Sequence, residues 1–473
     1  MIKSKSRSLL SLTLIYTIGN LSSKLISFLM VFFTTYYLTR EQVGEFDLIL
    51  ITINLLIPLV SLQLSDAGLR WLLGEKNDEF EIKRSITSIF VFLVLSILLF
   101  TIFYQSYCLF KPSSYSILFN LLLAMQVVYV FFQQTIRGLG FNKLYATNSV
   151  INAFVYCGTS ILLLTLFELK VEALLISNIF ALSLTSVQLF FRAKMYRYIS
   201  IHSFSFNHLR GLITYSLPLI PNSLSWWAMS SANRYMILLF LGAYANGIFA
   251  ISYKIPTIMT MLVGVFSLAW QESSILTYDS KDRDMYYTNI FKKYLCVIFS
   301  ISYLIISVNQ IFIKIAVSGE FFESYRYTPI LILSTIFNSI AGFYGTGYLG
   351  AKKTKHLLIS SVIGGITTLL ISLVLIPQFG LFGASTSILL GYIILSFLRV
   401  SQSKEYFIID FPHKIFIVYL ILYIIISAIG YIENLYANIF NVLFACCIIY
   451  VLNKNVIKSA IKTGLNKVIN IKN

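Results

Sequence analysis

The sequence predicts an all-α polytopic membrane protein with about fourteen transmembrane helices, and two observations carry that prediction. Of its 473 residues, 58% are hydrophobic and only 12% are charged, whereas ordinary soluble domains carry about 25% charged residues. Apolar runs of roughly 20 residues recur from end to end, each long enough to cross a hydrocarbon layer of about 30 Å as a helix. A soluble core could not bury this much apolar surface, so the expected solvent is lipid.

The first apolar run is expected to be a membrane span. It follows the basic leader Met1–Ser8 and continues to about Leu38, which is too long for the apolar stretch of a cleavable signal peptide, about 7–15 residues. The predicted spans lie near 9–38, 43–66, 85–110, 115–136, 145–167, 173–191, 213–241, 247–276, 294–317, 327–349, 357–376, 382–398, 415–431 and 435–452.

The net charge of +17 is distributed as a topology signal. With the N-terminus placed inside, 28 of the 36 Lys and Arg residues fall in inner segments and five in outer ones. This is the positive-inside bias, so both termini are expected in the cytoplasm. The charge is explained without a nucleic-acid partner, and none is predicted.

Cysteine and histidine give no sign of a metal site. The five cysteines lie within or at the ends of apolar spans without paired spacing, and the four histidines fall in inner loops. Metal sites need clustered ligands. We therefore predict no metal, no cofactor and no catalytic residue.

Two short alignments predict an internal duplication. LTREQVGEF (38–46) aligns with LGAYANGIF (241–249) at an offset of 203, and LGFNK (139–143) aligns with LGAKK (349–353) at an offset of 210. Such an offset covers six spans, an even number, so the two copies keep the same orientation, as in the parallel repeats of secondary transporters. The expected parts are two six-helix lobes, 1–200 and 201–405, and an appended helix pair with a basic cytoplasmic tail, 406–473.

Three cations lie inside predicted spans, where a charge costs several kcal/mol unless it faces water or a counter-ion. Lys24 is about 15 residues from either end of its span, too deep to reach the interface easily. Arg234 and Lys254 each lie about 10 Å below the turn between their adjacent spans, and this matched depth favours a joint anion site. The alternatives are packing of Lys24 against a buried acid and snorkelling of the other two cations to outer headgroups. The polar residues on or beside the same helix faces are Asn20, Asn222, Trp226 and Asn233.

Four further charged residues lie near inner span ends. Asp66 and Arg70 have the i,i+4 spacing of an intrahelical ion pair, and Arg137 opens an inner loop. Anchoring in the inner leaflet is the alternative role of the two arginines. Asp66 and Glu272 are the acids expected to serve ion coupling.

Four segments carry a family resemblance: SKLISFLMVFFTTYYLTREQVGEFDLIL (23–50), LSDAGLRWL (64–72), QQTIRGLGFNKLYATNSV (133–150) and YSLPLIPNSLSWWAMSSANRYMILLFLGAYANGIFAISYKIP (215–256). The first three resemble the amino-terminal half of Wzx-type flippases for lipid-linked oligosaccharides, and the fourth resembles their seventh and eighth helices. These flippases belong to the multidrug/oligosaccharidyl-lipid/polysaccharide exporter superfamily. The resemblance runs from about Lys24 to Arg399.

The resemblance implies two lobes around a cationic cavity in the bacterial cytoplasmic (inner) membrane. The implied substrate is an undecaprenyl-diphosphate-linked oligosaccharide, moved to the outer leaflet by alternating access for O-antigen or for capsular or exopolysaccharide synthesis. Coupling to H⁺ or Na⁺ is left open, and a polysaccharide polymerase is an implied partner. By position, the cavity-lining cations are Lys24, Arg234 and Lys254, and the basic residues of the amino lobe are Arg70 and Arg137.

One departure concerns the seventh helix, where many relatives carry Asp before the arginine and this chain has Asn233. A charged partner for Arg234 is therefore not assigned. The chemistry of the cations agrees with the implied substrate, because Arg and Lys are the usual partners of phosphate oxygens. Trp226 could stack against a sugar, with packing against lipid as its alternative.

Three other functions are alternatives to this interpretation. A peptidoglycan-precursor flippase shares the fold and the diphosphate carrier. A multidrug exporter of the same fold is disfavoured, because a cationic cavity repels cationic drugs. A membrane enzyme, such as a polymerase or acyltransferase, is disfavoured by the short outer loops and the lack of histidine within the predicted spans.

Overall fold

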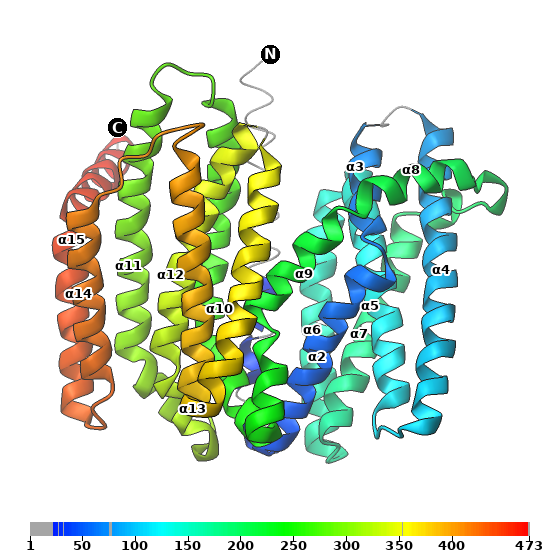
Figure 1. Ribbon diagram of the computed structural model, residues 1–473, viewed down its shortest axis with the longest axis horizontal. Helices are drawn as coiled ribbons and strands as arrows, with labels where there is room; N and C mark the ends of the chain where they lie inside the picture. The colour runs from blue at the N-terminus through cyan, green and yellow to red at the C-terminus, as the bar shows by residue number, and fades with distance from the viewer. Residues whose placement is uncertain (1–21, 27, 32, 75–77, 352, 472–473) are drawn as a thin grey trace. The chain divides into compact units, whose positions relative to one another are not determined.

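The computed structural model describes residues 22–26, 28–31, 33–74, 78–351 and 353–471, and its regular elements are helices (Figure 1). The chain forms two compact units. The first holds the described residues up to Ala250 together with Ser361–Ala384, and the second holds Ile251–Ser360 and the described residues from Ser385 onward. The predicted all-α class is confirmed.

The first unit is built around α5 and α7. Helix α7 packs against α5 and α6, and α5 also contacts α2, α3 and α4. Two helices, α10 (Asn233–Leu276) and α13 (Thr354–Ser403), continue from one unit into the other. The remaining helices of the first unit are α2 (Arg40–Val60), α3 (Leu64–Gly74), α4 (Glu79–Phe110), α5 (Ser116–Gly138), α6 (Asn142–Leu166), α7 (Val171–Arg192), α8 (Phe206–Ser216) and α9 (Leu219–Ser230), with short 3₁₀ turns at Met195–Arg197 and Ile201–Ser203.

The second unit is organised by α11, which contacts α12, α14 and α15. Tyr303 on α11 donates its hydroxyl hydrogen to the Tyr419 carbonyl on α14 at 2.7 Å. Trp270 stacks on Phe343 with ring centroids 4.3 Å apart. The helices of this unit are α11 (Arg283–Ala316), the 3₁₀ helix η3 (Gly319–Arg326), α12 (Thr328–Gly350), α14 (His413–Gly430) and α15 (Leu435–Ile471).

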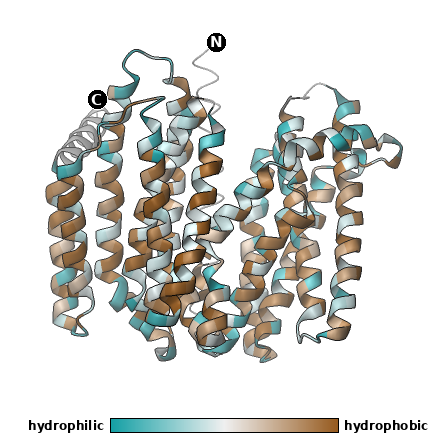
Figure 2. Cartoon of the chain, in the orientation of Figure 1, coloured by the Kyte–Doolittle hydropathy of each residue, from teal (hydrophilic) through white to brown (hydrophobic). Residues whose placement is uncertain are grey.

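The surface of the helices identifies a multi-pass membrane protein. In the described residues, eleven helices are long and apolar enough to cross a membrane. Figure 2 shows hydrophobic residues along the long helices and hydrophilic ones gathered near their ends. On α4, Leu99 and Phe103 are more than 70% exposed. Soluble proteins rarely show such large apolar patches, whereas lipid favours them.

Two of the eleven candidate spans are broken by a glycine. Helix α10 is interrupted at Gly242 (φ 84°, ψ 175°) and α13 at Gly380 (φ 57°, ψ −133°). A positive φ is strained for residues with a side chain but open to glycine. The sequence predicts a turn at each of these two places, and in the structure each turn consists of one non-helical glycine. The predicted span pairs that they separate are 213–241 with 247–276, and 357–376 with 382–398.

The predicted span 43–66 is shorter in the structure. Helix α2 ends at Val60, and Leu62 and Gln63 take left-handed φ values of 46° and 57° before α3 begins. Pro58 lies in the last turn of α2 and lacks the backbone N–H that would continue the helical bonding. Asp66 and Arg70 consequently lie on the separate helix α3.

Helix α2 crosses α10 at two glycines that the duplication aligns. A Cβ atom added to Gly44 would lie 2.1 Å from the Ala243 carbonyl oxygen, and one added to Gly247 would lie 1.9 Å from the Arg40 carbonyl oxygen. At the offset of 203, Arg40 aligns with Ala243 and Gly44 aligns with Gly247, so each contact is the counterpart of the other, as across a two-fold axis. Small residues allow helix backbones to come this close. The reciprocity supports the predicted duplication, while the lobe boundaries at 200 and 405 stay predictions.

The crossing predicts that Gly247→Ala destabilises the protein by about 1–3 kcal/mol, the usual cost of forcing extra volume into a packed site. Gly44→Ala should behave alike, because its Cβ also meets a backbone carbonyl. Thermal unfolding of the purified protein measures the effect. Gly158→Ala is the matched control, since nothing lies within 4 Å of its added Cβ. Equal melting temperatures for all three variants would contradict the close contact.

Candidate functional site

Arg234 is a buried cation in the described part of the first unit. It lies in the first turn of α10 and is 3% exposed. Its Nε donates to Asp47 Oδ2 on α2 at 3.2 Å, and its Nη1 donates to the Ser230 carbonyl at 3.3 Å. The guanidinium also lies over the Phe249 ring, 4.8 Å from its centroid. The Arg234 guanidinium is therefore neutralised by a carboxylate and hydrogen-bonded to the carbonyl of the last residue of α9.

Asp47 is a candidate site residue that the sequence did not predict. Its side chain is 17% exposed, and it supplies the counter-ion that Asn233 does not. The sequence does contain a signal for this ion pair. Asp47 lies seven residues after Arg40, where α2 begins, and Arg234 lies seven residues before the aligned segment that begins at Leu241. Asp47 and Arg234 therefore lie at equal depth on two helices, α2 and α10, that cross near the aligned turns, and this brings the two charges together.

Asn233 connects this ion pair to α13. It is 1% exposed, accepts a hydrogen bond from Arg234 Nη1 at 3.4 Å and donates one to the Ala384 carbonyl at 3.4 Å. An aspartate here could not donate to that carbonyl while ionised. The asparagine therefore fits a site in which Asp47 carries the negative charge.

A row of polar contacts holds α9 and the start of α10 along α2. Trp227 Nε1 donates to the Ile51 carbonyl at 2.9 Å, and Gln63 Nε2 donates to Ser223 Oγ at 2.6 Å. The hydroxyls of Thr52 and Tyr235 are 2.5 Å apart. The predicted residues Asn222 and Trp226 lie half-buried on α9 beside these contacts.

The two predicted lysines differ from Arg234 in that both are exposed. Lys24 lies in a helical segment of the first unit, and Lys254 lies on α10 in the second. Glu272 is exposed near the end of α10 in the second unit. Because Arg234 and Lys254 belong to different units, their joint anion site stays a prediction. Asn20 lies outside the described residues.

A second polar region of the first unit gathers around Asp66. Gln134 Nε2 donates to Asp66 Oδ1 at 2.9 Å, and Arg137 is close enough to act on Asp66 electrostatically. Arg137 also lies over the Tyr145 ring at 5.9 Å. A pocket of about 200 Å³ opens beside these residues. Its polar lining comes from Gln126, Tyr129, Gln133, Gln134, Tyr145 and Ser149.

The ion pair expected between Asp66 and Arg70 is absent from the described part of the chain. The Asp66 carboxylate is instead directed to α5, where Gln134 donates to it, and Arg70 is exposed on α3. The i,i+4 spacing alone does not decide the partner, because the tertiary structure brings the Gln134 amide of α5 to the carboxylate. In the described residues, no group of three or more potential metal ligands is present.

The geometry predicts strong coupling between Asp47 and Arg234. Removing either charge, by Asp47→Asn or Arg234→Gln, should cost about 3–5 kcal/mol, because it breaks the ion pair and leaves the other charge without its counter-ion. The double variant should cost less than the sum of the two, by at least about 1 kcal/mol. Thermal unfolding of the four proteins measures this coupling.

The exposed pair Lys83–Glu79, at 2.9 Å, is the matched control and should show coupling below about 1 kcal/mol. Additive effects of Asp47→Asn and Arg234→Gln would show that the two charges do not support each other.

Comparison with known proteins places this geometry in a family. A protein-family model described as "Polysaccharide biosynthesis protein" matches residues 9–270. No curated protein sequence matches the chain.

Solved structures establish the fold. The chain is similar to a structure described as the lipid II flippase MurJ in an inward closed conformation, with a TM-score of 0.71 and 14% identity over 95% of this chain and 100% of that one. A MATE transporter of Vibrio cholerae gives a TM-score of 0.60 and 14% identity over 85% and 98% of the two chains. A transporter of Pyrococcus furiosus from the same superfamily gives 0.60 and 12% identity over 83% and 94%.

These likenesses confirm the polytopic fold, and the family match confirms the resemblance predicted from the sequence. Because that match covers more than half of the chain, the protein belongs to the polysaccharide biosynthesis family of Wzx-type membrane transporters, within the multidrug/oligosaccharidyl-lipid/polysaccharide exporter superfamily.

Proposed function

We propose that the protein flips undecaprenyl-diphosphate-linked oligosaccharide repeat units from the cytoplasmic to the outer leaflet of the bacterial inner membrane. The observation that carries this proposal is the family match over residues 9–270. The product feeds O-antigen, capsular or exopolysaccharide synthesis, with a polysaccharide polymerase as the downstream partner. The chain crosses the membrane fourteen times, with both termini in the cytoplasm.

The cations suit the diphosphate of this substrate. Lys24 and Lys254 are exposed, so each presents an ammonium group that a multivalent anion can bind. Arg and Lys bind phosphate oxygens through short, charge-assisted hydrogen bonds. These two lysines therefore make the first contact with the headgroup.

Arg234 acts in a later step. Its guanidinium is engaged by Asp47, and a diphosphate that reaches it competes with that carboxylate for the same donors. Replacing the carboxylate by phosphate oxygens releases Asp47 and the start of α2. Binding of the headgroup is thereby linked to a movement of α2, which alternating access requires.

The coupling ion remains H⁺ or Na⁺ in this proposal. Asp66 and Glu272 are the carboxylates predicted for it, and Asp47 joins them because releasing it from Arg234 creates a new binding site for a cation. A peptidoglycan-precursor flippase is the second candidate, favoured by the fold shared with MurJ. The two candidates differ in glycan, not in headgroup.

The proposal predicts that Asp47→Asn/Arg234→Gln lowers surface polysaccharide about tenfold or more, since a charged hydrogen bond contributes about 1.5–3 kcal/mol. Lys24→Leu and Lys254→Gln should each lower it as well. The assay is complementation of bacteria lacking their own flippase, with the lipid-linked unit measured inside the cell, where it should accumulate. Lys111→Gln, an exposed cation at the end of α4, is the matched control.

Pairing both substitutions separates transport from folding, because the double variant leaves no unpaired buried charge. Normal surface polysaccharide from a well-expressed double variant would overturn the role of Arg234.

A further inference from the structure

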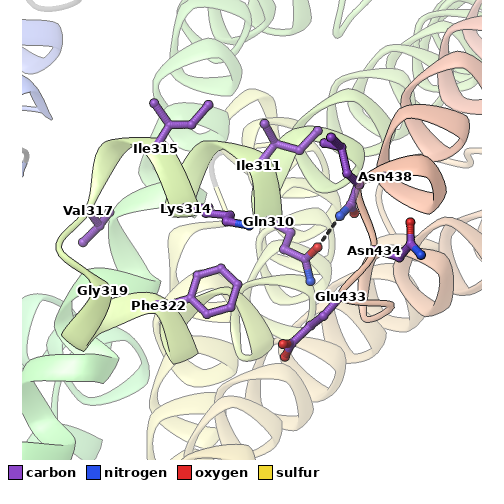
Figure 3. A pocket seen from close by; sticks show the side chains of 11 residues that line it. Gln310, Ile311, Lys314, Ile315, Val317, Gly319, Phe322, Glu433, Asn434 and Asn438 are labelled. Atoms are coloured by element: carbon purple, nitrogen blue, oxygen red, sulfur yellow. Dashed lines mark hydrogen bonds between the residues drawn. The ribbon is translucent and has the colours of Figure 1, made fainter.

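A cavity of about 510 Å³ lies within the second unit, where α11 ends and the chain enters η3 (Figure 3). Its lining comes from α11, the following 3₁₀ helix, and the connection from α14 to α15. Apolar walls are formed by residues such as Ile311, Phe322 and Leu435. The predicted cation sites Lys24, Arg234 and Lys254 do not line this cavity.

Two buried amides line the cavity between α11 and α15. Gln310 is 5% exposed and Asn438 is 4% exposed. Asn438 Nδ2 donates to Gln310 Oε1. Gln310 Nε2 and Asn438 Oδ1 have no hydrogen-bond partner in the described part of the chain. Figure 3 shows the nitrogen end of Gln310 directed toward the space between Phe322 and Glu433.

A ligand that both donates and accepts hydrogen bonds would satisfy the two remaining amide groups, one donor and one acceptor. Exchanging nitrogen and oxygen in both amides would again leave one donor and one acceptor. An unsatisfied buried polar group costs about 1–3 kcal/mol, so a ligand that satisfies both groups gains stability. Hydroxyl groups do both, whereas a phosphate only accepts and a hydrocarbon chain does neither.

Glu433 adds a carboxylate to the cavity, which Lys314 also lines. Its Oε1 accepts hydrogen bonds from the Tyr325 hydroxyl at 2.8 Å and from Arg326 Nη2 at 3.0 Å. These two contacts hold the pKa of the Glu433 carboxyl below its ordinary value, so the carboxylate is ionised at neutral pH. A carboxylate accepts hydrogen bonds from hydroxyls.

We propose that this cavity binds a neutral, hydroxylated sugar through Gln310, Asn438 and Glu433, with Phe322 as an apolar surface for the sugar ring. The inference deepens the proposed function and rests on it in one respect. The predicted topology places the end of α11 at the outer face, so the sugar is the glycan of the unit that has been flipped. The appended helices α14 and α15 thereby acquire a role in holding the delivered glycan.

The test uses the full chain in lipid nanodiscs, because glycoside detergents would themselves present sugars. The probe is an equimolar mixture of the methyl glycosides of glucose, galactose, mannose and N-acetylglucosamine, followed by saturation-transfer NMR. The expected result is binding to the wild type and a signal at least about fivefold lower for Gln310→Leu/Asn438→Leu, which corresponds to about 1 kcal/mol.

A matched control lies on the same helix pair. Asn453 on α15 donates to Ser300 Oγ on α11 at 2.9 Å, but it does not line the cavity. Asn453→Leu should keep the sugar signal. The double variant should melt no lower than the wild type, because replacing both partners of a buried hydrogen bond by apolar groups is nearly neutral.

Three results would overturn the inference: equal signals from the wild type and the double variant, absence of a signal from the wild type, or displacement of the glycosides by undecaprenyl diphosphate that carries no sugar. The last result would show that the cavity binds the lipid carrier. Each leaves the flippase proposal standing, since that proposal is tested by translocation and by the Arg234 variants.

Discussion

The Arg234 side chain stays inside the first unit because Asp47 neutralises it at 3.2 Å, and Asp47 reaches it because α2 and α10 come together at two glycines. A charge in hydrocarbon is tolerated only with such a partner or with water. The approach of Gly44 to the Ala243 carbonyl, and of Gly247 to the Arg40 carbonyl, therefore decides where the cation of the seventh span can lie. Larger residues at either glycine would separate the helices and leave both charges without partners.

The crossing of α2 and α10 packs two helices and also positions an ion pair. The same short segment of α2 carries the close contact at Gly44, the counter-ion Asp47 and the carbonyl of Ile51 that accepts from Trp227. A ligand that drew Arg234 away from Asp47 would weaken all of these contacts at one end of α2. An anionic headgroup has the chemistry to do so, and in the proposed function it would link headgroup binding to movement of α2.

Sequence patterns predicted the helical class, the family and the span boundaries near Gly242 and Gly380, because apolar run length is a local property. The sequence also aligned Gly44 with Gly247, but it did not predict the reciprocal contact between α2 and α10. Asp47 was not predicted because its partner Arg234 is 187 residues away in the sequence. The same limit explains Asp66, whose sequence neighbour Arg70 was expected to pair with it while the tertiary structure supplies Gln134.

Translocation itself provides the most direct test of the central claim. Purified protein in proteoliposomes would be supplied with undecaprenyl-diphosphate-linked oligosaccharide in one leaflet, and the other leaflet would be sampled with a glycosidase that cannot cross the bilayer. The account predicts that the wild type makes the glycan accessible to the enzyme, whereas folded Asp47→Asn/Arg234→Gln does not. Transfer by the wild type no faster than in protein-free vesicles would contradict it.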